Sequence, residues 1–176
     1  MTVGLHWSIK ETFVRYILGM QDGLYAITED ATVSPDFVFT YPVKDVSGFD
    51  PATGLGTLQF GGAVRFGGHG GALYVMIADP IVEISANGAI LSAKVDNDGE
   101  RLDLVTVDFG NAIGGSGDKG AQSGYIPSSD ATSSGTPEVS PSWDAAPTFL
   151  TANGASLFIG QYPAGTPFDP LDITLV

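Results

Sequence analysis

The opening residues of the chain carry its strongest helical pattern. Apolar side chains recur there at helical spacing and form a single stripe: Ile9, Phe13, Ile17 and Met20. Ser8, followed three residues later by Glu11, has the spacing of a capping box, in which a hydroxyl and a carboxylate each accept an N–H at the helix start. We therefore expect a helix that begins at Ser8 and ends at Gly19.

The rest of the chain alternates apolar and polar positions with a period of two, which is typical of strands with one buried face. Strands are predicted at residues 24–28, 37–41, 58–66, 73–77, 81–85, 89–95, 101–109 and 171–176, while residues 143–150 return the chain to the core. Asp79-Pro80 and Asp169-Pro170 are expected to bound strands, because proline has no N–H to give to a sheet ladder. Thr151 can cap a short second helix.

These elements predict a mainly β fold: an antiparallel β-sandwich or barrel-like domain with an N-terminal helix and a short C-terminal helix. The length of 176 residues suits a single domain over residues 1–176. Between residues 110–142 the composition shifts to Gly, Ser, Thr, Asp and Pro. That stretch is expected to be a long loop or a poorly patterned hairpin.

The composition excludes several classes of function. A net charge of −13 with only seven basic residues argues against nucleic acid and against an anionic membrane surface as partners. No run of eighteen apolar residues exists, so no transmembrane segment is expected. The absence of cysteine excludes disulfides and thiolate ligation and agrees with an exported protein. Charged residues interrupt the first twenty positions, so a signal peptide and an anchor are expected to lie outside this chain.

Two side chains are candidates for chemistry. Tyr16 lies at the margin of the apolar stripe, with Thr12 one helical turn earlier; a tyrosine in such a place usually packs at the edge of a core. His69 stands among four glycines, between a strand that ends at Phe66 and another that begins near Leu73. Turn glycines alone would explain a tight hairpin, but they also let a bulky group approach the main chain, and a hairpin needs no imidazole at its tip.

Four motifs follow one another along the chain. They are W-S-I-K-E-T-F-x-x-Y-I at residues 7–17, G-x-V-R-F-x-G-H-x-G-x-L at 62–73, the turn A-D-P at 78–80, and L-T-x-x-G-A-x-x-F-x-x-x-Y-x-A-G-T-x-x-D-P at 150–170. Together they resemble the HtaA domain, a family found in haem-uptake proteins of the actinobacterial cell surface. The resemblance spans nearly the whole chain, and four ordered motifs are far more specific than any one of them.

The resemblance implies a binding site for ferric haem. In that family a tyrosine on the first helix is the axial iron ligand, and a histidine from the glycine-rich hairpin hydrogen-bonds the tyrosine oxygen; these positions match Tyr16 and His69. A hydroxyl residue one turn before the tyrosine and a tyrosine near the C-terminus bind the haem propionates, which would match Thr12 and Tyr162. The expected cofactor is ferric protoporphyrin IX, with Tyr16 as the metal ligand.

The chemistry of these residue types agrees with that implication. Phenolate is a hard anionic donor that suits Fe(III), and tyrosine is an established haem ligand. Free tyrosine is protonated at neutral pH, so the iron and a hydrogen bond from His69 must favour the anion. A variant of this interpretation has His69 ligating the iron directly. Phe13 and Phe66 are expected to contact the haem, although both are equally suited to the ordinary core.

The resemblance implies capture and transfer of haem, by a secreted or cell-surface protein that is not an enzyme. Its partners would be haem, haemoglobin or another haem donor, and a membrane haem-transport system. A different interpretation is a β-sandwich adhesion or glycan-binding module without haem, in which Trp7, Tyr125 and Trp143 would serve as stacking platforms. Catalases also use tyrosine ligands, but no Ser-His-Asp or paired-carboxylate arrangement is supported by the spacing.

Overall fold

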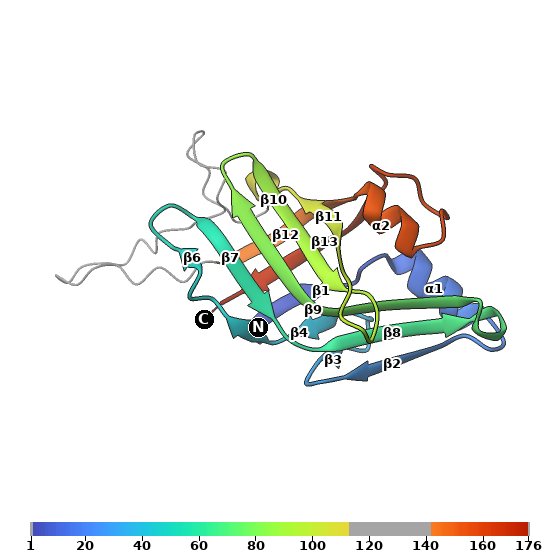
Figure 1. Cartoon of the computed structure of the whole chain (residues 1–176). Coiled ribbons are helices and arrows are strands. Elements are labelled where there is room, and N and C mark those ends of the chain that lie inside the picture. The colour runs from blue at the N-terminus through green and yellow to red at the C-terminus, as the bar shows by residue number, and fades with distance from the viewer. Residues whose placement is uncertain (1, 113–141, 176) are drawn as a thin grey trace.

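The computed structural model describes residues 2–112 and 142–175, and in this part the chain forms one extensive antiparallel sheet with two short α-helices (Figure 1). The strands are β1 Gly4–Trp7, β2 Leu24–Thr28, β3 Thr32–Val33, β4 Phe39–Tyr41, β5 Val43–Asp45, β6 Phe49–Asp50, β7 Leu55–Phe60, β8 Ala63–Gly68, β9 Leu73–Ser85, β10 Gly88–Lys94, β11 Arg101–Val107, β12 Ser142–Leu150 and β13 Pro167–Thr174. The helices are α1 Glu11–Gly19 and α2 Ala152–Leu157, with 3-10 turns η1 His69–Gly71 and η2 Phe109–Asn111. The predicted fold class is confirmed.

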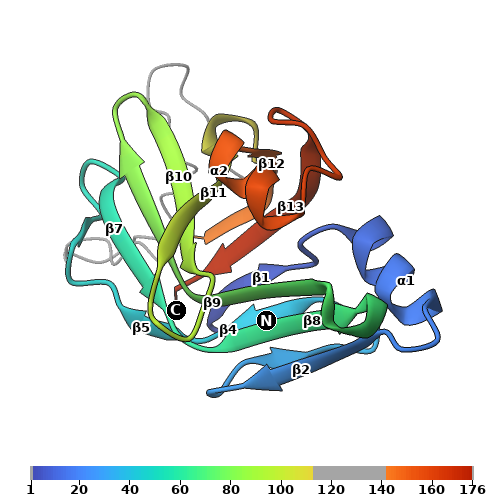
Figure 2. The same ribbon diagram turned by 45° about the vertical axis from the view of Figure 1, so that its right-hand side comes forward.

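The strands follow one another in a curved path that almost closes into a barrel (Figures 1 and 2). Hydrogen-bonded neighbours run in the order β2-β8-β9-β10-β11-β12-β13-β1-β4-β3, so the two ends of the path are consecutive in the chain. β7 lies off this path and pairs with β5, β6 and the second half of β9. Most of the predicted stretch 110–142 lies outside the described residues; Gly110 and Asn111 end η2, and Ser142 begins β12.

One long strand contradicts the expected break at Asp79-Pro80. β9 continues through this pair, which forms a bulge with Asp79 at a φ of 44°. Before the bulge β9 pairs with β8, as in Ala63↔Ala78, and after it with β7, as in Gln59↔Ile81. The missing N–H of Pro80 is tolerated because a bulge interrupts the ladder at that point. β13 likewise runs through Asp169-Pro170 instead of beginning after it.

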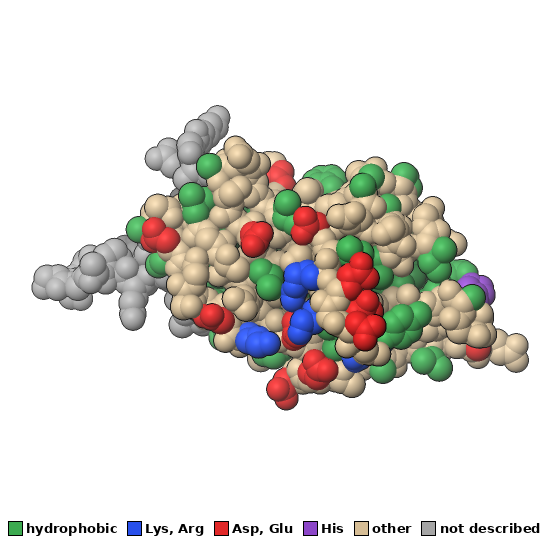
Figure 3. All heavy atoms as spheres, viewed as in Figure 1, with side chains coloured by type: hydrophobic (Ala, Val, Ile, Leu, Met, Phe, Trp, Pro, Cys, Tyr) green, Lys and Arg blue, Asp and Glu red, His purple; other side chains and the backbone are tan. Residues whose placement is uncertain are grey.

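Polar contacts hold this bulge in place. The Asp79 carboxylate accepts hydrogen bonds from the Gly62 N–H at 3.3 Å and from Lys94 Nζ at 2.8 Å. Arg101 Nη2 donates to the Asp79 carbonyl at 2.9 Å. Figure 3 shows lysine and arginine side chains gathered near the middle of one face, beside acidic ones, although the chain as a whole is strongly acidic. Lys94 and Arg101 have a structural role, since they bind groups of the bulge itself.

The predicted start of the first helix is wrong. Trp7 belongs to a strand, β1, and α1 begins at Glu11 after an extended Lys10 that makes no side-chain cap. The Glu11 N–H is instead accepted by Asp169 Oδ2 at 2.8 Å, from a residue 158 positions away. A tertiary contact therefore replaces the local capping box, and no local pattern could have indicated it. The predicted end at Gly19 is confirmed.

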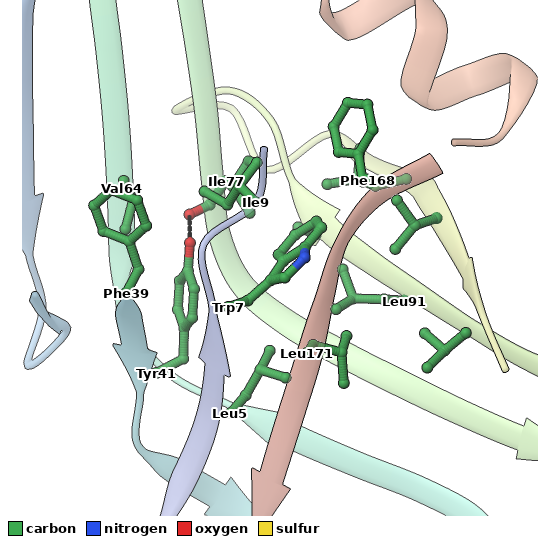
Figure 4. Packing of buried hydrophobic residues seen from close by; sticks show 14 of the residues in the cluster. Leu5, Trp7, Ile9, Phe39, Tyr41, Val64, Ile77, Leu91, Phe168 and Leu171 are labelled. Carbon is green, nitrogen blue, oxygen red and sulfur yellow. Dashed lines mark hydrogen bonds between the residues drawn. The ribbon is translucent and has the colours of Figure 1, made fainter. Parts of the chain in front are cut away.

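The core lies inside the curved sheet and is rich in large side chains. Figure 4 shows residues of β1, β4, β8, β9, β10 and β13 meeting there. Trp7 is 1% exposed, and its Nε1 donates to the Asp169 carbonyl at 2.8 Å. The Tyr41 hydroxyl donates to the Ile77 carbonyl at 3.2 Å, and burial raises the pKa of this tyrosine. The buried ring and indole groups make this side of the molecule dense and dry.

Both helices lie at one end of the molecule, next to the tip of the β8–β9 hairpin (Figures 1 and 2). α1 buries Phe13, Val14 and Ile17; Phe13 and Ile17 belong to the predicted stripe, whereas its other members, Ile9 and Met20, lie just outside the helix. Thr151 caps α2 as predicted, by accepting the Gly154 N–H at 2.9 Å. No helix in the described part of the chain is long and apolar enough to span a membrane.

Candidate functional site

Tyr16 and His69, the two candidate residues of the sequence, meet at the end of the molecule where the helices lie. The Tyr16 hydroxyl and His69 Nε2 are 2.5 Å apart and share a hydrogen bond, although 53 positions separate the residues in the chain. Either group can be the donor, depending on the tautomer of the imidazole. Tyr16 is 43% exposed, so its oxygen is accessible to a ligand.

Each member of the pair is presented by a well-defined element. Tyr16 lies on α1, which is anchored through the buried Phe13 and Ile17. His69 begins η1, the turn that joins β8 to β9, and has a φ of 51°. A non-glycine residue in the left-handed region is uncommon and is a form of backbone strain that clusters at functional sites.

The hairpin is fitted closely against the end of α1. A methyl group added to Gly68 would lie 2.5 Å from the Met20 side chain, so glycine lets the hairpin approach the helix. Beyond it, the Gly70 N–H donates to Asp22 Oδ2 at 2.7 Å. This hydrogen bond lowers the pKa of Asp22, which is fully exposed. Asp22 was not among the predicted site residues, because its partner is a backbone group and no side-chain motif marks the contact.

A small apolar pocket adjoins the Tyr16 ring. Its cavity volume is only about 10 Å³, and its walls come from α1, β9 and the turn after α2: Phe13, Tyr16, Leu73, Val75, Phe158, Ile159 and Gln161. Ile159 is 61% exposed and has a φ of 58°. The outer wall is therefore a strained turn with an apolar side chain held in solvent. A phenol at the rim of an apolar, partly aromatic pocket is suited to a flat apolar ligand that carries an electrophilic centre.

The other predicted site residues fall into two groups. Phe13 lines the pocket as expected, whereas Phe66 does not: it is 1% exposed and lies behind Phe13, with the two ring centroids 5.3 Å apart. Phe66 belongs to the core, because its alternating position on β8 points it inward. Thr12 is exposed on α1 one turn before Tyr16. Tyr162 is half-buried against Phe158, with ring centroids 6.0 Å apart.

Tyr162 has a basic neighbour that the sequence did not indicate. Lys10 Nζ lies 5.4 Å from the centroid of the Tyr162 ring and 5.4 Å from that of Phe168. It also donates to the Pro167 carbonyl at 3.1 Å. An ammonium group has three donors, so Lys10 retains donors for an anion at this side of the site. Val75, Phe158, Ile159 and Gln161 were likewise missed; of these, only Phe158 stands in a motif, as the F of the C-terminal one.

The structure removes two of the supports for a glycan-binding module. Trp7 and Trp143 are each 1% exposed and pack inside the core, so neither can serve as an exposed stacking platform. Tyr125, the third platform of that hypothesis, lies outside the described residues.

Comparisons with known proteins agree with one another. The family model described as Htaa matches residues 2–174. The C-terminal domain of HtaA from Corynebacterium glutamicum superposes with a TM-score of 0.68 at 24% identity, over 98% of this chain and 96% of that one. The N-terminal domain of the same protein gives 0.59 at 21% identity, over 98% and 96%. HtaB from this organism, described as a heme binding protein, gives 0.55 at 17%, over 97% and 90%. No curated protein matches the chain.

Proposed function

This chain belongs to the HtaA family, and from that premise we propose that it binds ferric haem, with Tyr16 as the axial iron ligand and His69 as the hydrogen-bond partner of the ligand oxygen. The observation that carries the proposal is the 2.5 Å contact between Tyr16 Oη and His69 Nε2. It supports the ligand assignment, because an imidazole beside an exposed phenol can accept the phenol proton when the oxygen binds a metal. The structurally similar HtaB, a heme binding protein, supports the choice of ligand.

The residues at the site fit ferric protoporphyrin IX. Phenolate is a hard donor for Fe(III), and the haem supplies the Lewis-acidic metal together with an apolar plane. His69 donates to the phenolate oxygen, fixes the direction of the Tyr16 ring and stabilises the negative charge. Phe13, Leu73 and Val75 offer an apolar wall beside Tyr16. Burying that plane against them is worth roughly 25 cal/mol per Å² of apolar surface.

The propionates would be bound at the side of the site where Tyr162 lies. Thr12 can donate a hydroxyl one turn below Tyr16, and Tyr162 can donate its own. Lys10, which lies over the Tyr162 ring, adds a positive charge. A local cation at this position explains how a chain with a net charge of −13 could bind a dianionic cofactor, since the nearest groups dominate in screened solution.

The pocket must widen when haem binds. Its cavity volume of about 10 Å³ is far below the roughly 300–1,000 Å³ typical of small-molecule sites. The exposed Ile159 and its neighbour Gln161 form the wall with the least support, because both follow the short helix α2. We expect this turn to move outward and then cover one face of the haem.

The role that follows is capture and transfer of haem during iron acquisition, without turnover. The site offers one iron ligand and one hydrogen-bond partner for it. The donor would be haemoglobin or another haem protein outside the cell, and the acceptor a membrane haem-transport system. A secreted or cell-surface location fits this role and agrees with a chain that contains no cysteine.

Titration of apo protein with haemin tests the proposal. Tyr16→Phe removes the ligand oxygen and keeps the ring, so it should abolish the ferric-tyrosinate absorption and weaken binding more than about 100-fold. Tyr74→Phe is the matched control, since Tyr74 is another exposed tyrosine, 47% accessible, on the neighbouring strand β9. Unchanged spectra for both variants would refute the assignment. Haem bound by Tyr16→Phe with an imidazole-type spectrum would instead identify His69 as the ligand.

A further inference from the structure

One hydrogen bond ties the segment after α1 to the turn that carries His69. The Gly70 N–H donates to Asp22 Oδ2 at 2.7 Å, and 48 positions separate the two residues. Asp22 lies in the connection between α1 and β2, a few residues beyond Tyr16. Gly70 directly follows His69. The bond therefore joins the two elements that present the members of the Tyr16–His69 pair.

The His69 turn needs such a support, because its own structure is strained and sparsely packed. His69, Gly70 and Gly71 have φ values of 51°, 63° and 95°, so three consecutive residues occupy the left-handed region. Within the described part of the chain, a methyl group added to Gly70 or Gly71 would meet no atom within 4 Å. The turn has one internal backbone bond, from the Ala72 N–H to the His69 carbonyl at 3.1 Å. Side-chain packing at the tip cannot fix the position of the imidazole.

The other end of the bond is rigidly attached to α1. A methyl group on Gly23 would lie 1.8 Å from the Ile17 carbonyl oxygen, so the connection folds back tightly on the helix. The Gly23 N–H also donates to the Met20 carbonyl at 3.2 Å. Asp22 lies between Met20 and Gly23 in the chain, so its backbone is held close to the end of the helix that carries Tyr16.

We propose that Asp22 is a positioning residue that holds His69 within hydrogen-bonding distance of Tyr16, by accepting the Gly70 N–H from the adjoining turn. Its consequence for haem rests on the proposed function, whereas the geometry itself can be measured without haem. When the bond is absent, the turn leaves its strained conformation for part of the time and the imidazole leaves the Tyr16 oxygen. The phenolate then loses its hydrogen-bond donor, and haem dissociates faster.

We expect Asp22 to position the His69 turn through its hydrogen bond with the Gly70 N–H more than through its negative charge. The carboxylate is ionised at neutral pH, because the Gly70 N–H holds the pKa of Asp22 below its ordinary value. An asparagine at position 22 would keep a carbonyl acceptor in the same place. Asp22→Asn should therefore preserve the geometry, whereas Asp22→Ala and the similarly sized Asp22→Leu should not. Asp22 is fully exposed, so all three variants are expected to fold.

A matched control exists elsewhere in the chain. Asp45 Oδ1 accepts the Ser47 N–H at 2.8 Å, and this bond lowers the pKa of Asp45, which is also fully exposed. Asp45 ends β5, which lies away from α1 and from the tip of the β8–β9 hairpin (Figure 2). Asp45→Ala thus removes the same kind of turn contact without touching the site.

The first test uses apo protein and NMR. In wild type, Asp22→Asn and Asp45→Ala, we expect cross-relaxation between the Tyr16 and His69 rings and a protected Gly70 amide. In Asp22→Ala and Asp22→Leu we expect both signals to be lost, with the same unfolding midpoint as Asp45→Ala. Persistent Tyr16–His69 cross-relaxation in Asp22→Ala would overturn the proposal, whether or not the protein binds haem.

The second test measures haem loss to an excess of a haem acceptor. Asp22→Ala should release haem about tenfold faster than wild type, which is the size of effect typical of groups that orient a metal ligand. Its ferric-tyrosinate band should also shift toward that of His69→Ala. Asp22→Asn and Asp45→Ala should keep the wild-type rate and band. Equal rates for all the variants would overturn the proposal and leave the assignment of Tyr16 intact.

Discussion

The two histidines of the chain lie in regions that are built in opposite ways. His6 is on β1, 6% exposed, with Nδ1 2.9 Å from Thr40 Oγ1 and Nε2 2.7 Å from the Thr2 carbonyl. His69 is exposed at a hairpin tip, on strained backbone, and Nε2 meets Tyr16. Both ring nitrogens of His6 serve the fold. The imidazole of His69 is held by a few directed contacts in a region with little packing, so it can respond to a ligand.

The difference separates stability from binding. The β1 region is fixed by strand pairing with β4 and β13 and by fully buried side chains such as Leu5 and Leu171. In the α1–hairpin region Phe13 packs on Phe66, but the hairpin tip is held by directed contacts, among them those of Met20, Asp22 and Tyr16. Substitutions in the first region should lower the free energy of unfolding, and those in the second should change binding with little cost in stability.

The largest effect is expected in the β1 region. Trp7→Ala removes a fully buried indole and its hydrogen bond to the Asp169 carbonyl, so it should lower the free energy of unfolding by about 3–5 kcal/mol. Denaturant unfolding followed by circular dichroism measures this loss. A decrease below about 1 kcal/mol would mean that the dense core beneath β1 does not carry the stability.

Substituting the two histidines in parallel gives the sharpest form of the comparison. His69→Ala should weaken haem binding about 10–100-fold and change the free energy of unfolding by less than about 0.5 kcal/mol. His6→Ala should cost about 1–3 kcal/mol of stability, because it leaves Thr40 and the Thr2 carbonyl without their partner, and the haem spectrum should not change. Haemin titration and denaturant unfolding of both variants measure these effects. A loss of stability in His69→Ala together with a loss of haem binding in His6→Ala would contradict the comparison.

Acid should weaken the fold through two carboxylates, Asp22 in the α1–hairpin region and Asp79 at the bulge of β9. The Gly70 N–H lowers the pKa of Asp22; burial raises that of Asp79, but the bond from Lys94 and the charges of Lys94 and Lys44 outweigh it. A depressed pKa adds stability that is complete above the ordinary value of 3.8 and is lost as the pH falls through the lower folded value. The unfolding free energy of apo protein should thus fall below about pH 4, and less steeply in Asp79→Asn. An identical slope in that variant would contradict the role given to Asp79.

The smallest effect is expected at the propionate side of the site. Lys10→Gln should weaken haem binding about two- to fivefold at low ionic strength, the range of an exposed ion pair, and the difference should shrink at high salt. Arg15→Gln is the control on the adjoining helix α1, since Arg15 pairs with Glu11 and lines a different pocket together with residues 35–37. If haem binding by the two variants depended equally on salt, Lys10 would have no role in binding the propionates.

The sequence was most informative where one element carries its own pattern. The buried face of α1 at Phe13 and Ile17, its end at Gly19 and the Thr151 cap of α2 depend on neighbours within a few residues, and these parts of the prediction are confirmed. The meeting of Tyr16 with His69 could be expected only from the ordered motifs, because nothing in either local pattern indicates a partner 53 positions away.

The predictions failed where distant groups take over a local role. Asp169 replaces Ser8 as the acceptor for the start of α1, and bulges let β9 and β13 continue through Asp-Pro pairs. Phe66 is 1% exposed behind Phe13, because strand alternation fixes its direction, and its expected contact with haem stays a prediction. Asp22 accepts a hydrogen bond from a backbone N–H, and no sequence motif predicts such a contact.

The central claim is that the Tyr16 oxygen binds the iron of ferric haem. Resonance Raman spectra of the ferric haem complex test it most directly, since phenolate modes are enhanced only when a tyrosinate is bound to the metal. The account predicts these modes in the wild type and in Tyr74→Phe, and their disappearance in Tyr16→Phe. Phenolate modes that persist in Tyr16→Phe, or a wild-type complex without them, would contradict it.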